Sequence, residues 1–156
     1  MSTPEAWPDL AGRIEDGIHL LPIRIYYEDT DFSGIVYHAN YLRFAERSRS
    51  DFLRLAGVHH HELFEGDNPL AFAIHRMEMD FVRPARIDDV LEVRTRYVTA
   101  KGARLEVLQS IWRGDEELWR AKVMAAVIDQ QGKPRRLPKS VVAKLSPLVR
   151  PLTVSS

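Results

Sequence analysis

The stretch that decides the fold lies near the start of the chain, where residues 26–41 read YYEDTDFSGIVYHANY. It places two aspartates, a glycine and a histidine between an alternating apolar segment and a long amphipathic segment. A helix N-terminus offers unpaired backbone N–H groups and a partial positive charge, and an aspartate just upstream could serve as a base or a nucleophile. The same residue types are ordinary turn and cap residues. On local chemistry alone, a plain strand-to-helix connection therefore stays an alternative.

The residues around this stretch predict one helix and five strands. A helix is expected from about Asn40 to Ala56, because apolar and small side chains recur at spacings of three and four and Gly57 stands at the C-cap position. Apolar and polar residues alternate in five other segments, at 21–27, 76–81, 91–97, 104–111 and 119–127. A period of two is typical of antiparallel strands with one covered face. Gly102 and Gly114 mark tight hairpin turns.

This order of elements predicts an α+β fold in which one long helix packs on a curved antiparallel five-stranded sheet. Residues 1–18 show no sustained period and are interpreted as a loose N-terminal extension. The domain itself spans residues 19–148 and ends in a short helix near 141–148, and residues 149–156 form a tail. One helix cannot cover so large an apolar sheet, so a second copy of the chain is expected to help.

A specific pattern within this framework is similar to a known family. Residues 27–41 read Y-x-D-T-D-x-x-G-I-V-Y-H-A-N-Y, followed by FAERSR at 44–49 and by FVRPARIDD at 81–89. The chain thereby resembles the hotdog-fold thioesterases, most closely the YbgC-like acyl-CoA thioesterases associated with the bacterial Tol–Pal system, in the 4-hydroxybenzoyl-CoA thioesterase group. The dense match covers about residues 20–57 and a looser one continues to about 145. The resemblance implies a hotdog fold, acyl-CoA hydrolysis and a homodimer or homotetramer.

The resemblance also implies roles for individual residues. The family carboxylate corresponds to Asp31, the backbone N–H that polarises the thioester oxygen falls on His38, and Tyr27 corresponds to the tyrosine near the carboxylate. Whether Asp31 attacks the carbonyl directly or activates water stays open. Asp29 is interpreted as a structural partner of the turn. Glu46, on the helix where another hotdog branch keeps its carboxylate, is a second candidate only.

Four basic residues are the predicted contacts of the CoA phosphates. Lys101, Arg104, Arg135 and Arg136 stand on or beside predicted turns, and the family binds CoA with basic residues on such loops, often across a subunit interface. Guanidinium groups suit phosphate oxygens, although each of these residues read alone is an ordinary solvated charge. The histidines at 59–61 predict a polar loop, because adjacent histidines point in different directions and the i,i+4 ligand spacing is absent. Neither a metal nor a cofactor is expected.

Composition narrows the remaining classes of protein. The 156 residues suit one domain, and 22 basic against 22 acidic residues argue against a nucleic-acid partner. The chain has no cysteine, which excludes disulfides and thiolate chemistry. Neither a bilayer-spanning apolar run nor a secretory signal is present in the sequence, so a cytoplasmic location and no transmembrane segment are expected.

Two other functions compete with acyl-CoA hydrolysis. A hotdog hydratase or dehydratase places its catalytic histidine and carboxylate differently. A non-catalytic acyl-CoA-binding regulator would need an attached DNA-binding domain, which about 18 loose residues cannot form. The presence of both Asp31 and His38 also favours an enzyme.

Overall fold

The computed structural model describes residues 7–59, 63 and 67–152. One long helix stands between the second and third strands, and a short helix follows the last strand. In chain order the elements are β1 (Arg13–Glu15), β2 (Ile18–Arg24), the 3₁₀ turn η2 (Tyr27–Asp29), α1 (His38–Leu55), β3 (Ala71–Phe81), β4 (Val90–Lys101), β5 (Arg104–Arg113), β6 (Glu116–Ile128), α3 (Lys139–Leu145) and the 3₁₀ turn η3 (Ser146–Leu148).

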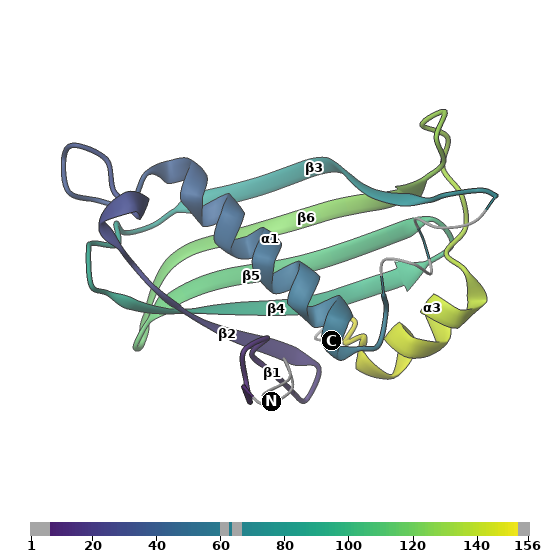
Figure 1. The fold of residues 1–156 in the computed structure, drawn as a ribbon, viewed down its shortest axis with the longest axis horizontal. Coiled ribbons are helices and arrows are strands. Elements are labelled where there is room, and N and C mark those ends of the chain that lie inside the picture. The colour runs from purple at the N-terminus through teal and green to yellow at the C-terminus, as the bar shows by residue number, and fades with distance from the viewer. Residues whose placement is uncertain (1–6, 60–62, 64–66, 153–156) are drawn as a thin grey trace.

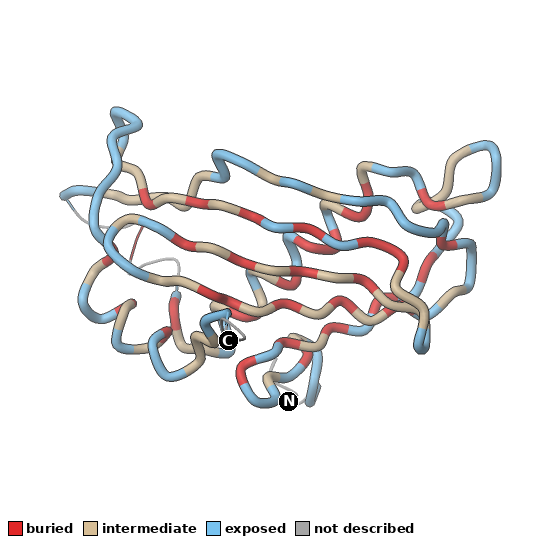
Figure 2. Tube along the Cα trace, turned by 180° about the vertical axis from the view of Figure 1, so that it is seen from behind, coloured by how far each residue is buried: buried red, intermediate tan, exposed pale blue. Residues whose placement is uncertain are grey.

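The strands form one antiparallel sheet in the order β1-β2-β4-β5-β6-β3, and α1 lies across one of its faces (Figure 1). Seen from behind, buried and less buried residues alternate along the central strands (Figure 2). This alternation is the predicted period of two, and it arises because one face packs against α1. Gly102 and Gly114 adopt positive φ values of 63° and 61° at the two hairpin turns. The predicted α+β hotdog architecture is confirmed, with six strands in place of five.

The additional strand comes from the N-terminal segment. Residues 13–18 were expected to belong to a loose extension, but β1 pairs with β2 from Arg13 opposite Leu20 to Glu15 opposite Ile18. The turn between them is Asp16-Gly17, in which both residues have positive φ, as a two-residue hairpin turn requires. A strand of three residues is too short to show a period, so the alternation that revealed the other strands could not reveal this one.

The helix α1 ends as the sequence predicts. Gly57 has a φ of 85°, its N–H donates to the Arg54 carbonyl, and the Val58 N–H donates to the Leu53 carbonyl. These two bonds form the left-handed helix end that glycine favours. The helix begins at His38, two residues before the expected start. No helix within the described residues is both long and apolar enough to cross a bilayer.

Between α1 and the sheet lies a connected row of buried polar side chains. The Nδ1 of His19 lies 2.8 Å from the Ser48 hydroxyl, which lies 2.5 Å from the Thr95 hydroxyl. The amide nitrogen of Gln109 donates to that threonine oxygen over 2.8 Å. All four side chains are buried. Each polar atom in the row therefore depends on its neighbours for the hydrogen bonds that water would otherwise supply.

The two ends of this row fix the direction of its hydrogen bonds. At one end the Gln109 amide nitrogen also donates to the Ala45 carbonyl, so its Oε1 faces Arg49 and accepts from that guanidinium over 2.7 Å. At the other end the His19 Nε2 lies 2.7 Å from the Ala11 carbonyl, which can only accept. His19 therefore carries its proton on Nε2 and accepts at Nδ1. Burial lowers the pKa of His19, which favours this neutral form.

The C-terminal segment packs back on the sheet. The predicted terminal helix is present as α3 and η3. Within residues 149–152 of the predicted tail, the Arg150 N–H donates to the Tyr97 carbonyl over 2.9 Å, and the Arg96 guanidinium donates to the carbonyls of Arg150 and Pro151. The described part of the tail is thus tied to β4.

Candidate active site

The predicted site lies on a folded loop that connects β2 to α1, residues 25–37, here called the Asp31 loop. Thr30 and Val36 form an isolated antiparallel bridge, and the Asp31 N–H donates to the Ile35 carbonyl over 2.9 Å. Gly34 closes the tip with a φ of 85°, a conformation that suits glycine. These bonds turn the chain back on itself, so that the segment carrying Asp31 runs beside the segment that enters the helix.

Asp29 holds this loop against the first turn of α1. Its carbonyl accepts from the Tyr37 N–H over 3.0 Å and from the buried Asn40 amide over 2.8 Å. Its carboxylate accepts from the Tyr26 N–H over 2.8 Å. The interpretation of Asp29 as a structural partner is therefore confirmed, and Asn40 acts as an anchor inside the helix.

The Asp31 carboxylate is held by Ser33 and stays accessible. The Ser33 hydroxyl and N–H both donate to the same oxygen, Oδ1, over 2.5 and 2.8 Å. The Ser33 hydroxyl, with backbone N–H groups, lowers the pKa of Asp31 below its usual value. Within the described part of the chain, Oδ2 accepts no hydrogen bond. The arrangement leaves one ionised oxygen available to a substrate or to water.

The start of α1 is open to solvent. His38 is its first residue, and the preceding Tyr37 makes no side-chain cap. No acceptor for the His38 N–H occurs among the residues the structure describes. The exposed His38 ring lies 4.6 Å from the Tyr37 ring and 6.2 Å from the Phe81 ring on β3, measured between ring centroids. The helix start thus offers a free backbone donor beside an aromatic surface.

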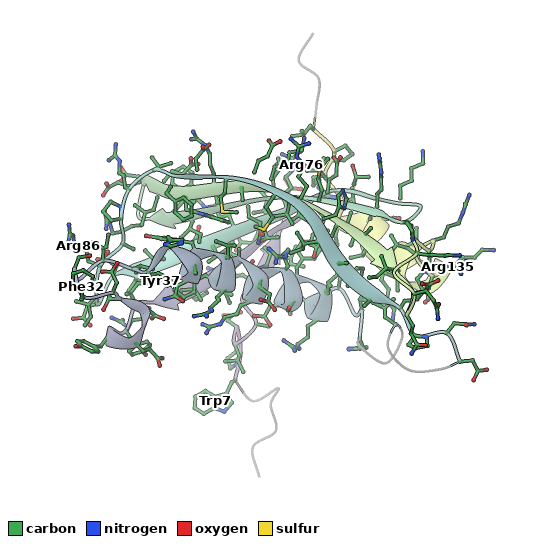
Figure 3. All side chains as sticks on the ribbon, turned by 90° about the horizontal axis from the view of Figure 1, so that it is seen from above. Trp7, Phe32, Tyr37, Arg76, Arg86 and Arg135 are labelled. Atoms are coloured by element: carbon green, nitrogen blue, oxygen red, sulfur yellow. The ribbon has the colours of Figure 1, made fainter. Side chains whose placement is uncertain are left out.

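Aromatic side chains surround this end of the molecule. Phe32 is fully exposed at the loop tip, and the Tyr27 side chain is 83 % exposed on η2. Figure 3 shows Phe32 and Tyr37 at the same end of the molecule as Arg86. The structure thus places Tyr27, Asp31 and His38 on one continuous loop-and-helix segment, although no hydrogen bond joins these three side chains to one another. Exposed aromatic surface of this kind is where a ligand or partner is expected.

The four basic residues predicted to bind CoA lie elsewhere in the same chain. Strand β4 runs 12 residues, from Val90 beside the site to Lys101 at its far end, which is roughly 35–40 Å of extended chain. Arg104 follows the turn at that far end. Figure 3 shows Arg135 at the end of the molecule opposite Phe32. One copy of the chain therefore does not bring these cations to Asp31.

Two of these arginines lie on the loop that follows β6, residues 129–138, here called the far loop, and they differ in their partners. Arg135 donates to the Asp129 carboxylate over 2.7 Å, in an ion pair that also helps to lower the pKa of Asp129, after the larger effect of the Lys133 N–H. Arg136 is exposed, and its side chain makes no hydrogen bond or ion pair within the described residues. Arg136 is thus more available to a ligand than Arg135.

A cation that the sequence analysis did not assign lies at the site itself. Arg86 is exposed and stands opposite Ile35 in a backbone bridge, which brings the segment after β3 beside the Asp31 loop. Its residue type was visible in the motif at 81–89, but this long-range bridge leaves no signal in the sequence. Of the histidine triplet, His60 and His61 lie outside the described residues. Within the described residues no group of three potential ligands could hold a metal ion.

Comparison with known proteins places this geometry in a family. A model of the thioesterase-like superfamily matches residues 26–145. The chain belongs to the thioesterase-like superfamily. Within it the chain is a YbgC relative: it is 40% identical over 127 residues to the acyl-CoA thioester hydrolase YbgC of Escherichia coli O6:H1, covering 79% of this chain and 92% of that protein. The resemblance inferred from the Asp31 motif is thus confirmed.

Two further relatives agree with this family assignment. The acyl-CoA thioesterase YbgC of Haemophilus influenzae is 40% identical over 123 residues, covering 78% of this chain and 90% of that one. A probable thioesterase from Bartonella henselae, known from its crystal structure, is 47% identical with a TM-score of 0.73, covering 78% of this chain and 99% of that one. The superfamily match begins at Tyr26, the first residue of the stretch that carries the site.

Proposed function

We propose that this chain hydrolyses acyl-CoA thioesters to a free acid and CoA, with Asp31 as the reacting carboxylate. The observation that carries the proposal is the pairing, on one loop, of an ionised carboxylate with a free Oδ2 and a helix start whose His38 N–H has no acceptor within the described residues. Family membership supports the choice of thioester as the substrate class.

In this mechanism the helix start activates the substrate. The thioester oxygen accepts a hydrogen bond from the His38 backbone N–H, and the positive end of the α1 dipole stabilises the charge that develops on that oxygen. The free Oδ2 of Asp31 then either attacks the carbonyl carbon, giving a mixed anhydride that water cleaves, or takes a proton from an attacking water. In both routes the carbon–sulfur bond breaks and the CoA thiol leaves. The exposed Tyr27 hydroxyl contacts the bound thioester near Asp31.

The position of the basic residues supports a CoA site that is completed by a second copy of the chain. Strand β3 forms one edge of the sheet, and Ile74 and Phe81 on it and Val82 just after it are exposed. A long unpaired edge with apolar side chains calls for cover. If two copies pair antiparallel through β3 about a two-fold axis, the Ala71 end of one copy meets the Phe81 end of the other.

Such a pairing brings the far loop of one copy to the site of its partner. Ile128, which precedes that loop, pairs with Ala71 at the start of β3, and Phe81 contacts His38 at the other end of the strand. We therefore place Arg136, and less directly Arg135, Lys101 and Arg104, on the CoA phosphates bound at the partner's Asp31 site, in a dimer or tetramer. Light scattering tests the assembly: a stable monomer of 18.0 kDa at micromolar concentration would contradict it.

Substitution of Arg136 tests the assignment of CoA. Arg136→Ala should raise KM for acyl-CoA several-fold with little change in kcat, since a phosphate contact is equal in the ground and transition states. Arg135→Ala is the matched control and should have a smaller effect, because Arg135 is paired with Asp129. Both variants should act normally on a short thioester that lacks the nucleotide. An unchanged KM in Arg136→Ala would leave that residue an ordinary solvated charge.

The reaction itself is tested by release of free thiol from a panel of acyl-CoA thioesters of different chain length and aromaticity. The proposal predicts thiol release with at least one member of the panel, matched mole for mole by free acid. No release above the uncatalysed rate across the panel would contradict the proposed function.

A further inference from the structure

Near the start of α1 lies a buried hydroxyl group to which the mechanism gives no role, that of Tyr41. This residue follows His38 by three positions on the helix and is 3 % exposed. Its ring stacks on Trp119 at 6.5 Å and meets Phe81 edge-on at 5.8 Å, measured between ring centroids. A phenylalanine ring would fill the same space, so these contacts do not account for the hydroxyl. Because a buried hydroxyl is unfavourable unless it is hydrogen-bonded, its partner is the informative feature.

The hydroxyl binds the backbone of the connection between β3 and β4, residues 82–89. Its oxygen accepts the Ala85 N–H over 2.9 Å, and within the described residues it makes no other hydrogen bond. The Ala85 carbonyl in turn accepts the Val36 N–H of the Asp31 loop over 2.9 Å. Ala85 and Val36 are both buried, so water does not compete for these bonds. The Tyr41 hydroxyl therefore reaches the Asp31 loop through a single residue.

Three short antiparallel segments form a small platform at this point: 30–31, 35–36 and 85–86. A bridge between Thr30 and Val36 joins the first two segments, and a bridge between Ile35 and Arg86 joins the last two. Asp31 lies on the outer segment, where its N–H donates to the Ile35 carbonyl. Figure 1 shows the loop before α1 and the connection from β3 to β4 at the same end of the molecule. The inner segment, 85–86, thus supports the segment that carries the carboxylate.

The inner segment is held from two sides. The Asp89 carboxylate accepts the Arg86 N–H over 2.8 Å and the Arg113 guanidinium of β5 over 2.8 Å, which ties the platform to the sheet. The Tyr41 hydroxyl ties it to α1, the element whose first N–H belongs to His38. Of these two contacts, only the one from Tyr41 joins the platform to the helix that offers the donor.

We propose that Tyr41 is a positioning residue for thioester hydrolysis: its hydroxyl fixes the platform on α1 and thereby sets the Asp31 carboxylate against the His38 N–H. Asn40, the preceding residue, holds the loop before Asp31 through the Asp29 carbonyl, and Tyr41 holds it after Asp31. The proposal rests on the proposed function, because both positioned groups act there on one carbonyl. A misplacement of about 1 Å between reacting groups can cost about a hundredfold in rate.

Substitution by phenylalanine removes the hydroxyl and keeps the ring. Tyr41→Phe should lower kcat for acyl-CoA by about tenfold or more and change KM by less than about twofold, since misplaced reacting groups lower turnover more than binding. Thr95→Val is the matched control, because it also removes a buried, hydrogen-bonded hydroxyl, but one in the row away from the loop. Both variants should unfold more easily, and Thr95→Val should keep its kcat. An unchanged kcat in Tyr41→Phe, or an equal loss in Thr95→Val, would overturn the proposal.

A double variant separates positioning from loss of stability. In the Asp31→Asn background, Tyr41→Phe should change the residual turnover little, because Tyr41 acts through Asp31 and residues that act as a unit are not additive. The same fold-loss in both backgrounds would contradict the proposal. If Tyr41→Phe fails to fold, Asp89→Ala loosens the platform from its other side and should lower kcat in the same way. An unchanged kcat in Asp89→Ala would show that the platform does not set the carboxylate.

NMR titration of the Asp31 carboxyl carbon needs no turnover. The Ser33 hydroxyl, together with the N–H groups of Ser33 and Ile35, lowers the pKa of Asp31, and these donors stand on the same loop. Tyr41→Phe should therefore raise the pKa of Asp31 toward its usual value, and Thr95→Val should leave it unchanged. Equal Asp31 titration in all three proteins would overturn the proposal. If no acyl-CoA is cleaved, the proposed function fails, and this titration still decides whether Tyr41 positions Asp31.

Discussion

Two regions along α1 use polar residues in opposite ways. At the middle of the helix, His19, Ser48, Thr95 and Gln109 are buried and bonded to one another in a single direction. At its N-terminal end, Asp31 and His38 keep an oxygen and an N–H without partners within the described residues. In the first region the hydrogen bonds stabilise the contact between helix and sheet. In the second region an unpaired donor and an unpaired acceptor remain available to a substrate.

This difference separates stability from activity along one helix. A buried polar group that loses its partner costs free energy of folding, whereas an exposed carboxylate at a loop contributes little to it. We therefore expect substitutions in the buried row to change the free energy of unfolding and substitutions in the loop to change turnover.

The largest expected effect is on turnover at the loop. Asp31→Asn removes the charge and the nucleophilic or basic oxygen, and should lower kcat for acyl-CoA by at least about a hundredfold. Thiol release measures this effect. Glu28→Gln is the matched control, since Glu28 is an exposed carboxylate on η2 whose side chain makes no hydrogen bond within the described part of the chain, and it should keep nearly full activity.

One outcome would assign the reacting carboxylate to α1 instead of to the loop. Near-normal turnover in Asp31→Asn, together with loss of activity in Glu46→Gln, would assign the chemistry to the carboxylate on α1. Equal losses in Asp31→Asn and Glu28→Gln would indicate damage to the loop rather than to a catalytic group.

The second effect is on stability in the buried row. Thr95→Val keeps the side-chain shape but leaves one Gln109 amide hydrogen without an acceptor and the Ser48 oxygen without a donor, so it should lower the free energy of unfolding by about 1–3 kcal/mol. Thr99→Val on the same strand is the control, because Thr99 is partly exposed and its bond to Glu106 is long, at 3.5 Å. Urea denaturation measures both. Equal effects of the two substitutions would contradict the stabilising role of the buried row.

The comparison also shows what the sequence could predict. The helix, the sheet face and the Asp31 loop were predictable because each leaves a local signal: a helical period that ends at Gly57, a period of two interrupted by the hairpin glycines, and a dense motif. The buried row was not predictable, since His19, Ser48, Thr95 and Gln109 come from four elements. In the sequence Gln109 reads only as a polar residue in an apolar position.

The arrangement of the site was predictable only in part. Asp31, His38 and Tyr27 share one segment, so their proximity follows from the chain itself. The pairing of Ile35 with Arg86 and the separation of Arg135 from Asp31 depend on how distant strands are ordered. No local pattern encodes that order. The motif could therefore predict the position of the site, but the sequence could not show that the basic residues of the same copy lie far from it.

A third effect concerns pH and the buried row. Because burial lowers the pKa of His19 below its usual 6.5, the unfolded chain takes up a proton before the folded chain does. Stability is then full above about pH 6.5 and falls as the pH drops through the lower folded pKa. His19→Gln should flatten this part of the curve below about pH 6.5. Chemical denaturation across this range measures the slope, and an equal slope in both proteins would contradict the assignment.

The smallest effect is a shift in the pH profile of the loop. The Ser33 hydroxyl is the main cause of the lowered pKa of Asp31, so Ser33→Ala should raise that pKa toward its usual value. If activity requires the ionised carboxylate, it is lost as the pH falls through this pKa, and the acidic limb of kcat/KM should move to higher pH in the variant. Activity near pH 7 should change little. An acidic limb at the same pH in both proteins would contradict an effect of Ser33 on the reacting carboxylate.

One helix thus carries groups for catalysis at its start and groups for stability at its middle. The most direct test measures kcat/KM for one acyl-CoA and the free energy of unfolding together, on Asp31→Asn and Thr95→Val. We expect a crossed result, in which Asp31→Asn loses at least about a hundredfold in turnover and unfolds normally, whereas folded Thr95→Val retains turnover and unfolds more easily. Loss of both properties in both variants, or normal turnover in Asp31→Asn, would contradict it.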